Sequence, residues 1–361
     1  MIKAFKKMNS YLLLLSFMVL FANSSTCSYC GRSISGRYTI LNNKHYHNTC
    51  YENHIRLSCD HCDKKITGTY TETEGKNYHP SCYRDHIQER CAQCGQLISG
   101  LYNTKDDKQY HEACFINYII PKCDICRLPI QDQYIEDFWG NMYHEKHTNA
   151  LPDCDNCSRL ICEPLTGGGY SINGKRYVCS VCEPSVVSDQ VQIARSLRGV
   201  KTLLNKVGIQ DLPMGIPITL VADKDELVRL SGNRLGKIRG YTQYEAKTLG
   251  GRTISETYHI YILSDLSEII FDAVLAHELL HVFQIQNGYK LRSDIKEGFC
   301  NLGSKLVYDH DGSDLARLQL KTMYESDDPD YGVGFRNMSS RLNEMGWGGI
   351  LNNLALSLIH I

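Results

Sequence analysis

The feature that most constrains this chain is a 32-residue spacing of cysteine pairs in its first half. Cys27, Cys59, Cys91 and Cys123 each open a Cys-x-x-Cys pair. A fixed period of this kind indicates a repeated structural unit. In the first three units His-x-x-Cys follows after sixteen residues, the fourth ends in two histidines, and a fifth, longer unit ends in two cysteines. The five sets are Cys27, Cys30, His47, Cys50; Cys59, Cys62, His79, Cys82; Cys91, Cys94, His111, Cys114; Cys123, Cys126, His144, His147; and Cys154, Cys157, Cys179, Cys182.

Each unit therefore offers four nitrogen or sulfur ligands, which is the donor set of tetrahedral structural zinc. Two short ligand pairs around a hairpin-sized insertion can close around a metal without a pre-existing core. A disulfide ladder is the alternative, but it does not explain why histidine recurs in register with cysteine, and the count of 17 cysteines is odd. We predict about five structural zinc ions. The tyrosines before each second ligand pair and those eight residues past the second cysteine are predicted to form small cores: Tyr46, Tyr78, Tyr110, Tyr143 and Tyr177, and Tyr38, Tyr70, Tyr102 and Tyr134.

This pattern resembles the LIM family of paired zinc modules, whose usual role is to grip protein partners. The connections between the five modules here are eight, eight, eight and six residues long. A typical LIM domain has a two-residue connection, so the stacking of neighbouring modules is left open. The array is predicted to be a binding surface. The chain carries 39 Lys plus Arg against 40 Asp plus Glu, and this balance argues against a nucleic-acid partner.

The first 26 residues have the pattern of a secretory signal. Lysines precede an apolar run from Tyr11 to Phe21, and small residues follow it. The run is too short to span a bilayer. We therefore expect a secreted or periplasmic protein with no stable membrane span after signal removal. The alternatives are a chain anchored in a membrane through its N-terminus and lipidation at Cys27.

After Cys182 cysteine almost disappears and the periodicity changes to that of an α+β domain. Apolar residues from Val187 to Val207 follow one helical face, which predicts a helical linker over 185–208. Strands are predicted at 216–222 and 253–263, with a short helix capped by Asp223 between them. A long helix is expected from Ser264 as N-cap to about Gly288. The predicted domains are 1–26 signal, 27–184 zinc modules (27–50, 59–82, 91–114, 123–147, 154–182), the linker, and 209–361.

The long helix contains His277-Glu278-Leu279-Leu280-His281. Histidines four apart stand on one side of a helix, so both rings can reach one metal, with Glu278 beside the open coordination position. Apolar residues surround the motif on nearly every side, and buried polar groups without partners are costly. This is the arrangement of a zincin peptidase, in which zinc activates water and Glu278 is the general base.

A third metal ligand is expected from the following helix. Glu297 lies sixteen residues after His281, and Asp294 is the rival. The strand at 253–263 precedes the metal helix and is predicted to be the edge strand that aligns extended substrates. An oxyanion stabiliser is also needed. The sequence does not choose among its four candidates, which are His259, His310, Tyr324 and Tyr331.

The whole combination resembles the plant family of ubiquitin-activated, LIM-domain peptidases that limit organ size, and their bacterial relatives. The residues that carry the resemblance are Leu275 to His281, Glu297-Gly298-Phe299-Cys300, Glu325-Ser326-Asp327-Asp328 and Tyr331-Gly332-Val333-Gly334-Phe335-Arg336, with the all-cysteine module. The resemblance covers roughly residues 59 to 355. It implies a latent endopeptidase with one catalytic zinc and LIM-type partner binding. The additional first module and the export signal depart from the plant members, which puts ubiquitin dependence in doubt.

The predicted fold is thus a row of small zinc-bound LIM-like modules followed by an α+β zincin-like metallopeptidase domain. Its predicted partners are a protein or peptide substrate and a protein bound by the module array. One rival is a non-catalytic adaptor with a degenerate peptidase domain. Another is an aminopeptidase, which needs an acidic anchor for the substrate's amine, with Glu256, Asp265 and Glu268 as candidates.

Overall fold

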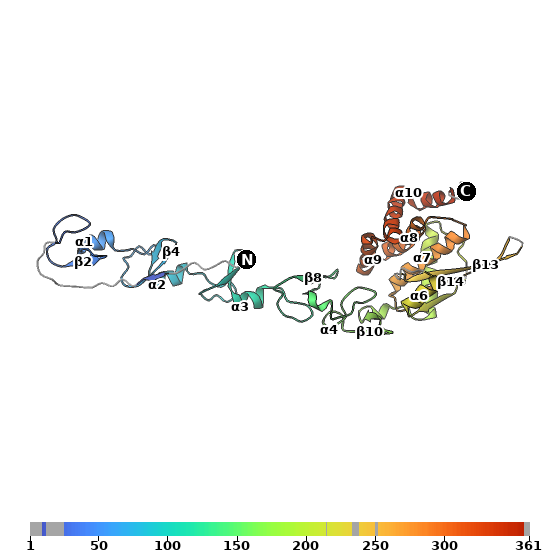
Figure 1. Ribbon diagram of the computed structural model, residues 1–361, viewed down its shortest axis with the longest axis horizontal. Helices are drawn as coiled ribbons and strands as arrows, with labels where there is room; N and C mark the ends of the chain where they lie inside the picture. The colour runs from blue at the N-terminus through green and yellow to red at the C-terminus, as the bar shows by residue number, and fades with distance from the viewer. Residues whose placement is uncertain (1–8, 12–24, 214, 233–237, 250–251, 357–361) are drawn as a thin grey trace. The chain divides into compact units, whose positions relative to one another are not determined.

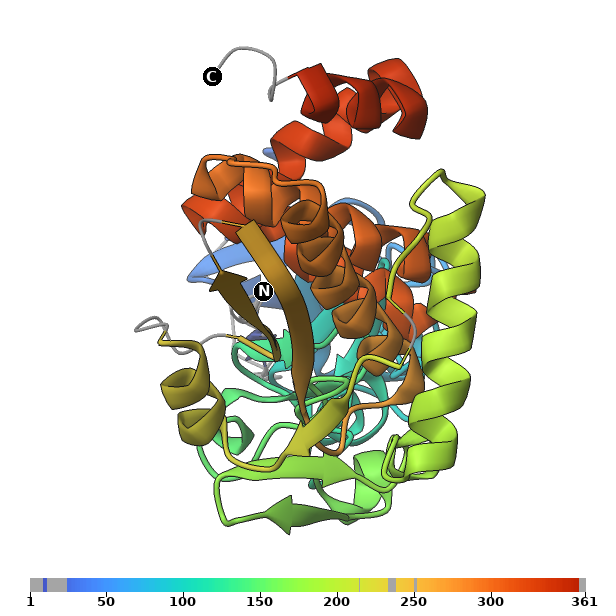
Figure 2. The ribbon, with the colours of Figure 1, turned by 90° about the vertical axis from the view of Figure 1, so that its right-hand side faces the viewer.

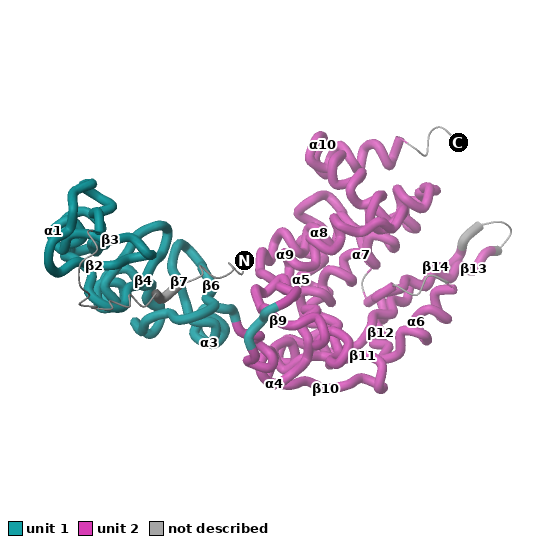
Figure 3. The backbone as a smooth tube through the Cα atoms, turned by 60° about the vertical axis from the view of Figure 1, so that its left-hand side comes forward, with its two compact units in different colours: residues 1–121, 129–131 teal, residues 122–128, 132–361 magenta. Residues whose placement is uncertain are grey.

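The computed structural model describes residues 9–11, 25–213, 215–232, 238–249 and 252–356. Most of the predicted signal segment, residues 1–8 and 12–24, lies outside the described residues. The chain forms two compact units, coloured separately in Figure 3: residues 1–121 with 129–131, and residues 122–128 with 132–361. Within the described residues, no helix combines the length and the apolar character needed to cross a membrane.

The first three zinc modules share one local fold, a β-hairpin followed by a short helix and a π-helical turn. Both central residues of each hairpin turn have positive φ, as at Asn42 and Asn43 (47° and 61°), which is the geometry of the tight type I′ turn. Strand β1 (Asn9–Tyr11) pairs antiparallel with β4. The elements are β2 (Tyr38–Leu41), β3 (Lys44–His47), α1 (Asn48–Cys50) and η1 (Tyr51–Ile55); β4 (Tyr70–Thr73), β5 (Lys76–Tyr78), α2 (Pro80–Cys82) and η2 (Tyr83–Ile87); β6 (Tyr102–Lys105), β7 (Lys108–His111), α3 (Glu112–Cys114) and η3 (Phe115–Ile119).

The cores of these modules are very small. In the second module, for example, Cys59, Ile66 and Tyr78 are buried, and partly buried side chains such as Leu57 and Tyr70 pack against them. The tyrosines before the second ligand pair are buried in the first four modules, as predicted, whereas Tyr177 of the fifth module is only half-buried. The second tyrosine series does not behave uniformly, because Tyr134 is 50% exposed. Two or three apolar side chains cannot by themselves offset the entropy of ordering about 25 residues.

The fourth and fifth modules pack against each other in the second unit. Trp139 of the fourth module donates its indole N–H to the Cys157 carbonyl (2.9 Å). The Arg159 guanidinium lies 3.6 Å from the centre of the Trp139 ring. The two modules are therefore stacked. Their elements are β8 (Tyr134–Glu136), β9 (Met142–His144), η4 (Glu145–His147), α4 (Glu163–Thr166), β10 (Gly169–Ile172), β11 (Arg176–Cys179) and η5 (Glu183–Ser185).

The C-terminal region contains a three-stranded sheet of β12 (Ile218–Val221), β13 (Gly240–Leu249) and β14 (Arg252–Leu263). The strand order is β12-β14-β13, with β12 parallel and β13 antiparallel to β14. The hairpin of β13 and β14 is visible in Figure 1. The predicted edge strand at 253–263 is therefore the central strand, and this prediction was wrong. The edge strand is β13, which sequence analysis missed.

Among the described residues after Ser185, seven helical segments accompany this sheet. They are α5 (Gln190–Lys206), α6 (Lys224–Ser231), α7 (Glu268–Gln286), α8 (Ser293–Asp311), α9 (Asp314–Glu325), η6 (Pro329–Val333) and α10 (Gly334–Leu356). The N-cap of α7 is Ser267 and not the predicted Ser264. The helix cannot start at Ser264 because Asp265 has a φ of +60°, which lies outside the right-handed helical region.

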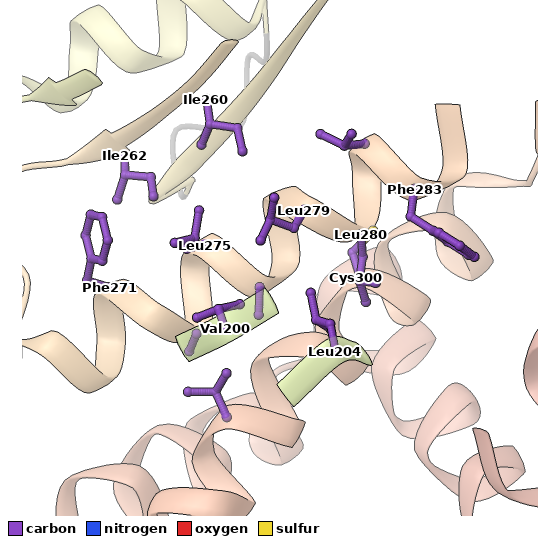
Figure 4. Packing of buried hydrophobic residues seen from close by; sticks show 14 of the residues in the cluster. Val200, Leu204, Ile260, Ile262, Phe271, Leu275, Leu279, Leu280, Phe283 and Cys300 are labelled. Carbon is purple, nitrogen blue, oxygen red and sulfur yellow. The ribbon is translucent and has the colours of Figure 1, made fainter. Parts of the chain in front are cut away.

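Helix α7 is the centre of the hydrophobic core. Its side chains Leu275, Leu279 and Leu280 are fully buried among residues of β14, α5 and α8 (Figure 4). Helix α5 contributes Val200 and Leu204 to the same core, and Figure 2 shows it as the long yellow-green helix that flanks the orange helices. Helix α5 lies in the segment predicted to be a linker, and it is part of this core.

Candidate functional site

The structure gathers each of the five predicted ligand sets into one cluster. Within each set the ligand atoms lie within 4.8 Å of one another. In the first set, Cys30 Sγ and His47 Nδ1 are 3.5 Å apart, and in the fifth set Cys157 Sγ and Cys179 Sγ are 3.6 Å apart. Zinc bonds of about 2.3 Å to sulfur and 2.0 Å to nitrogen, at tetrahedral angles, separate such atoms by about 3.5–3.8 Å. The spacing of the side chains therefore fits zinc.

The local backbone favours the thiolate form that a metal requires. The backbone N–H of His79 donates to Cys59 Sγ (3.5 Å). Burial raises the pKa of Cys59, but hydrogen bonds from backbone amides outweigh it and lower the pKa to about 6. The same arrangement recurs at Cys27, where the His47 N–H donates to the sulfur. A thiolate held in this way is a ready metal ligand.

A further cluster lies in the C-terminal region, between α7 and α8. His277 and His281 approach each other through their Nε2 atoms, which are 3.1 Å apart. Each Nε2 lies 3.3 Å from Glu297 Oε2. Ligand atoms bound to one tetrahedral zinc at about 2.0–2.1 Å are about 3.3 Å apart. The predicted ligand Glu297 is thus brought to the histidines, whereas Asp294 pairs with Arg292 (2.7 Å) instead.

When both imidazoles are neutral and carry their proton on Nδ1, these three atoms are all acceptors, with no donor among them. Glu297 Oε2 is buried and has no hydrogen-bond partner within the described residues. Burial raises the pKa of Glu297, but the two neighbouring imidazoles of His277 and His281 outweigh burial and hold this pKa well below its ordinary value. Lys296 Nζ pairs with the other oxygen, Glu297 Oε1 (3.1 Å), whereas Oε2 faces only the two imidazole nitrogens, and a cation bound there would offset its desolvation. The residues present therefore fit a zinc ion.

Side chains behind the histidines fix their orientation. His277 Nδ1 lies 2.9 Å from Asn301 Oδ1, and Asn301 Nδ2 donates to the Tyr331 carbonyl (2.8 Å). Because the amide nitrogen of Asn301 is used by that carbonyl, its oxygen accepts from Nδ1–H of His277. The Nε2 of His277 is then the unprotonated nitrogen that a metal can bind.

The second histidine is held in a similar way. His281 Nδ1 lies 3.3 Å from both Gln284 Oε1 and Cys300 Sγ. Burial raises the pKa of Cys300 to about 11, so this cysteine is a neutral thiol. Neither Cys300 nor Asn301 was among the site residues predicted from the sequence. Their spacing from Glu297, at i+3 and i+4 on a helix, is the signal that could have found them.

Close approach of the helices depends on glycines. A Cβ on Gly303 would lie 3.0 Å from the Ala276 carbonyl of α7, and a Cβ on Gly298 would lie 2.4 Å from the Gly334 carbonyl. Real side chains do not tolerate the second distance, so α8 meets its neighbours through bare backbone at these points. Gly298, next to Glu297, therefore permits this close packing.

Glu278 lies beside this cluster and lines an open cleft of about 1310 Å³. Its Oε2 accepts a hydrogen bond from the Thr242 hydroxyl (2.7 Å), and its backbone carbonyl accepts from the same hydroxyl (3.1 Å). Gly240, Tyr241 and Thr242 of β13 line the same cleft. Gly240 is required here, because a Cβ would lie 2.5 Å from Glu278 Oε1. Strand β13 therefore positions this carboxylate.

The four candidate oxyanion stabilisers occupy different places. Tyr331 lines the cleft, and its ring stacks on His277 with centroids 6.1 Å apart. Burial and the charges of Glu297 and Glu278 raise the pKa of Tyr331, so its hydroxyl keeps its proton. The others have contacts elsewhere: His259 with Thr219 and Tyr261, Tyr324 with Ser339 and Phe335, and His310 on the exposed end of α8.

The three candidate anchors for a substrate amine also have contacts elsewhere. Glu256 accepts from the hydroxyls of Tyr244 and Tyr258 on the hairpin. Asp265 accepts from Tyr170 (2.9 Å), and Glu268 pairs with Arg195 (3.0 Å). The structure does not bring any of these three to the cleft lining.

Replacing Asn301 by Ala is expected to weaken zinc binding at His277, His281 and Glu297 by about 10–100-fold, because His277 loses the acceptor that orients it. Chelator competition on the purified chain measures this affinity. Asn301→Asp keeps the acceptor and serves as the matched control. Equal affinity for the Ala variant and the wild type would contradict the assigned role of Asn301.

Comparison with known proteins gives partial matches. No family model matches the chain. It is 24% identical over 194 residues to Protein DA1 of Arabidopsis thaliana, covering 46% of this chain and 36% of the relative. It is 24% identical over 198 residues to LIM domain-containing protein HDR3 of Oryza sativa subsp. japonica, covering 47% and 39%. It is 22% identical over 280 residues to Protein DA1-related 7 of Arabidopsis thaliana, covering 60% and 49%.

The aligned segments thus span less than half the length of each of these relatives. The similarity supports a relation to DA1-like, LIM-domain plant proteins and no finer assignment. Together with the tandem Cys/His clusters, it supports a zinc-binding protein with LIM-like modules.

Proposed function

We propose that this chain is a zinc-dependent peptidase, an endopeptidase of the His-Glu-x-x-His type, whose LIM-like modules bind a protein partner or regulate cleavage. The observation that carries the proposal is the meeting of three acceptor atoms, from His277, His281 and Glu297, next to Glu278 in an open cleft. Helices α7 and α8 bring buried polar groups together at this point. Their desolvation is unfavourable unless a metal binds there.

A zinc ion held by these three residues would supply Lewis acidity toward a scissile carbonyl and toward water. Side chains of the protein supply the proton transfer that the reaction also needs. Glu278 receives the proton of the attacking water and passes it to the leaving amine. Thr242 donates to one carboxylate oxygen of Glu278 (2.7 Å), which leaves the other oxygen to face the substrate.

Substrate binding is assigned to the cleft edge formed by β13. This strand pairs with β14 on one side and stands at the end of the sheet in the described residues. An extended peptide can add to such an edge through backbone hydrogen bonds, which favours unfolded or extended substrates over any one sequence. The cleft volume of about 1310 Å³ is sufficient for several residues of a peptide.

Tyr331 is the proposed oxyanion stabiliser. It lines the cleft beside His277, and its raised pKa keeps a proton on the hydroxyl. A neutral hydroxyl can donate to the oxygen that gains charge as the scissile carbonyl is attacked. Its backbone is fixed by the hydrogen bond from Asn301, so the same network orients a metal ligand and this donor.

The proposal is tested by loading the chain with zinc and following cleavage of an unfolded protein. The wild type is compared with His281→Ala, which removes a ligand of the cleft site and leaves the five module sites intact. We expect one zinc ion fewer in the variant and cleavage by wild type alone. If the wild type binds this zinc but does not cleave under any tested condition, the adaptor reading is favoured. Release of single N-terminal residues instead of internal fragments would favour an aminopeptidase.

Gly240→Ala is expected to lower cleavage about 100-fold while the zinc content stays unchanged. The added Cβ would lie 2.5 Å from Glu278 Oε1 and 2.7 Å from Val274 Cγ1, so the carboxylate must move by about an ångström. Steady-state cleavage rates measure the loss of activity, and metal analysis checks that the zinc content is unchanged. Gly199→Ala in α5 is the control, since a Cβ there meets nothing within 4 Å. Equal activity of both variants would contradict the assigned role of β13.

A further inference from the structure

The fifth zinc module is attached to the start of α7 by a buried polar contact. The side chain of Asn156, which stands between Cys154 and Cys157, is fully buried. Its Oδ1 accepts from the Ser267 N–H (2.9 Å), and its Nδ2 donates to the Asp265 carbonyl (3.0 Å). Ser267 is the N-cap of α7, the helix that carries His277, Glu278 and His281. This single side chain therefore satisfies backbone groups on both sides of the turn into α7.

Asp155 and Asn156, the two residues between Cys154 and Cys157, form a turn that we call the Asp155–Asn156 turn. This turn also contacts the residue before β13. The guanidinium of Arg239 donates to the Asp155 carbonyl (3.2 Å) and to Gln319 Oε1 (3.0 Å). Gln319 in turn donates to the Asn156 carbonyl (2.9 Å). Arg239 directly precedes Gly240, the residue that lies against Glu278. Both elements that hold Glu278 are thus fastened to the Asp155–Asn156 turn.

A third group of contacts, made by Arg176 and Tyr170, also holds the Asp155–Asn156 turn and the segment before α7 in place. Arg176 is almost completely buried, with its side chain 3% exposed, and it donates to Asp155 Oδ2 (2.7 Å) and to the Ser264 carbonyl (2.9 Å). Tyr170 donates to Asp265 Oδ1 (2.9 Å). Buried groups of this kind are costly to leave without partners, so the turn cannot move without a penalty at several points.

The shape of the turn depends on the four cysteines around it. All four are buried, and Cys154 Sγ accepts from the Cys179 backbone N–H (3.3 Å). Four buried thiolates repel one another unless a cation binds them, and a Cys-x-x-Cys turn keeps its tight conformation when both sulfurs bind one metal. The metal at this site consequently determines where the Asp155 and Asn156 groups point.

We propose that the metal held by Cys154, Cys157, Cys179 and Cys182 positions the cleft residues through the Asp155–Asn156 turn, with Asn156 as the positioning residue. The inference rests on the proposed function, because it assigns the fifth module to the catalytic machinery. Partner binding is left to the other modules. Occupancy of this site then controls the geometry of Glu278 and of the His277, His281 and Glu297 cluster.

The test compares zinc-loaded full-length chains of wild type, Asn156→Ala, Asn156→Asp and Gln93→Ala. Gln93 occupies the same place in the third module's Cys-x-x-Cys turn and is the matched control. Asn156→Asp keeps the acceptor for the Ser267 amide. The readouts are amide hydrogen exchange at residues 267–271 and 240–242, release of the cleft zinc to a chelator, and kcat and KM for an unfolded protein substrate.

For Asn156→Ala we expect exchange about tenfold or more faster at both segments. The cleft zinc is released more readily and kcat falls with little change in KM. Partial recovery is expected in Asn156→Asp and wild-type behaviour in Gln93→Ala. Faster exchange confined to Ser267, or equal effects of Asn156→Ala and Gln93→Ala, would overturn the inference. If no chain cleaves but exchange and zinc release respond as described, the proposed function fails while the coupling stands.

The role of the metal itself is tested with Cys182→Ser and Cys114→Ser, each of which removes one ligand of one module. Only Cys182→Ser is expected to accelerate exchange at 240–242 and to release the cleft zinc. Equal responses would overturn the inference. If Cys182→Ser does not fold, the Asn156 variants still decide the question.

Discussion

Glu278→Gln is expected to abolish cleavage of an unfolded protein, with a rate loss on the order of 10²–10⁴-fold, while the cleft zinc is retained. The substitution keeps the shape of the side chain and an oxygen that accepts from the Thr242 hydroxyl, which now donates to Oε2 at 2.7 Å. It removes the group that receives a proton from water. His277, His281 and Glu297 are unchanged, so zinc content should equal that of the wild type. Metal analysis and cleavage rates on the same preparation measure both quantities.

The matched control is Glu268→Gln on the same helix. Glu268 forms an exposed ion pair with Arg195 (3.0 Å) at the start of α7, and loss of such a pair costs little. Its variant should cleave at the wild-type rate. Loss of zinc from Glu278→Gln would show that this residue supports the metal site, and full activity would exclude Glu278 as the general base.

Removal of zinc is expected to unfold the first three modules while the helices of the C-terminal region keep their structure. Structural zinc contributes about 10–16 kcal/mol of apparent binding free energy in small zinc domains. Burial of one large apolar side chain contributes only about 1.5–3 kcal/mol, and the buried core of the second module is Cys59, Ile66 and Tyr78, with a few partly buried side chains around them. Zinc binding therefore contributes much more to the stability of such a module than the burial of its apolar side chains does. Amide signals of the hairpin strands β2 to β7, followed by NMR during chelator titration, measure the unfolding.

A single-site control separates metal loss from general destabilisation. Cys59→Ser should release one zinc and unfold only the hairpin of β4 and β5, because each module has its own core. Hairpin signals that survive a chelator but disappear with a thiol reductant would contradict zinc ligation and indicate disulfide bonds. The helical core around α7 contains many fully buried side chains, so it should not depend on the module metals.

The local parts of this fold were accessible from the sequence because their partners lie close in the chain. His47 and Cys30 are 17 positions apart across one hairpin, and a His-x-x-x-His spacing places two rings on one helical face whatever the surrounding fold. The predicted strands near 218–221 and 252–263 and the helices from 190 and 268 are present within a few residues. Helix boundaries shifted where a turn residue such as Asp265 adopts positive φ.

The parts that were missed depend on the packing of distant segments. Strand β13 escaped detection because Gly240, Thr242 and the charged residues after them give a weak apolar alternation. Its place against α7 rests on the contact of Thr242 with Glu278, 36 positions away. Likewise, Tyr331 reaches the cleft because η6 leads into α10, whose first residue Gly334 lies against Gly298 of α8, a contact that no local pattern encodes.

The sequence by itself determined the five ligand sets, the helix that carries His277 and His281, and the carboxylate proposed to act with them, because ligand spacing and helical periodicity are local properties. The tertiary structure alone decided that Glu297 rather than Asp294 meets the histidines and that β13 borders the cleft. It also decided that Asn156 and Gln319, 163 positions apart, join the fifth module to this region. Such contacts arise from the docking of whole elements, whose free energy is spread over many residues that a linear pattern does not relate.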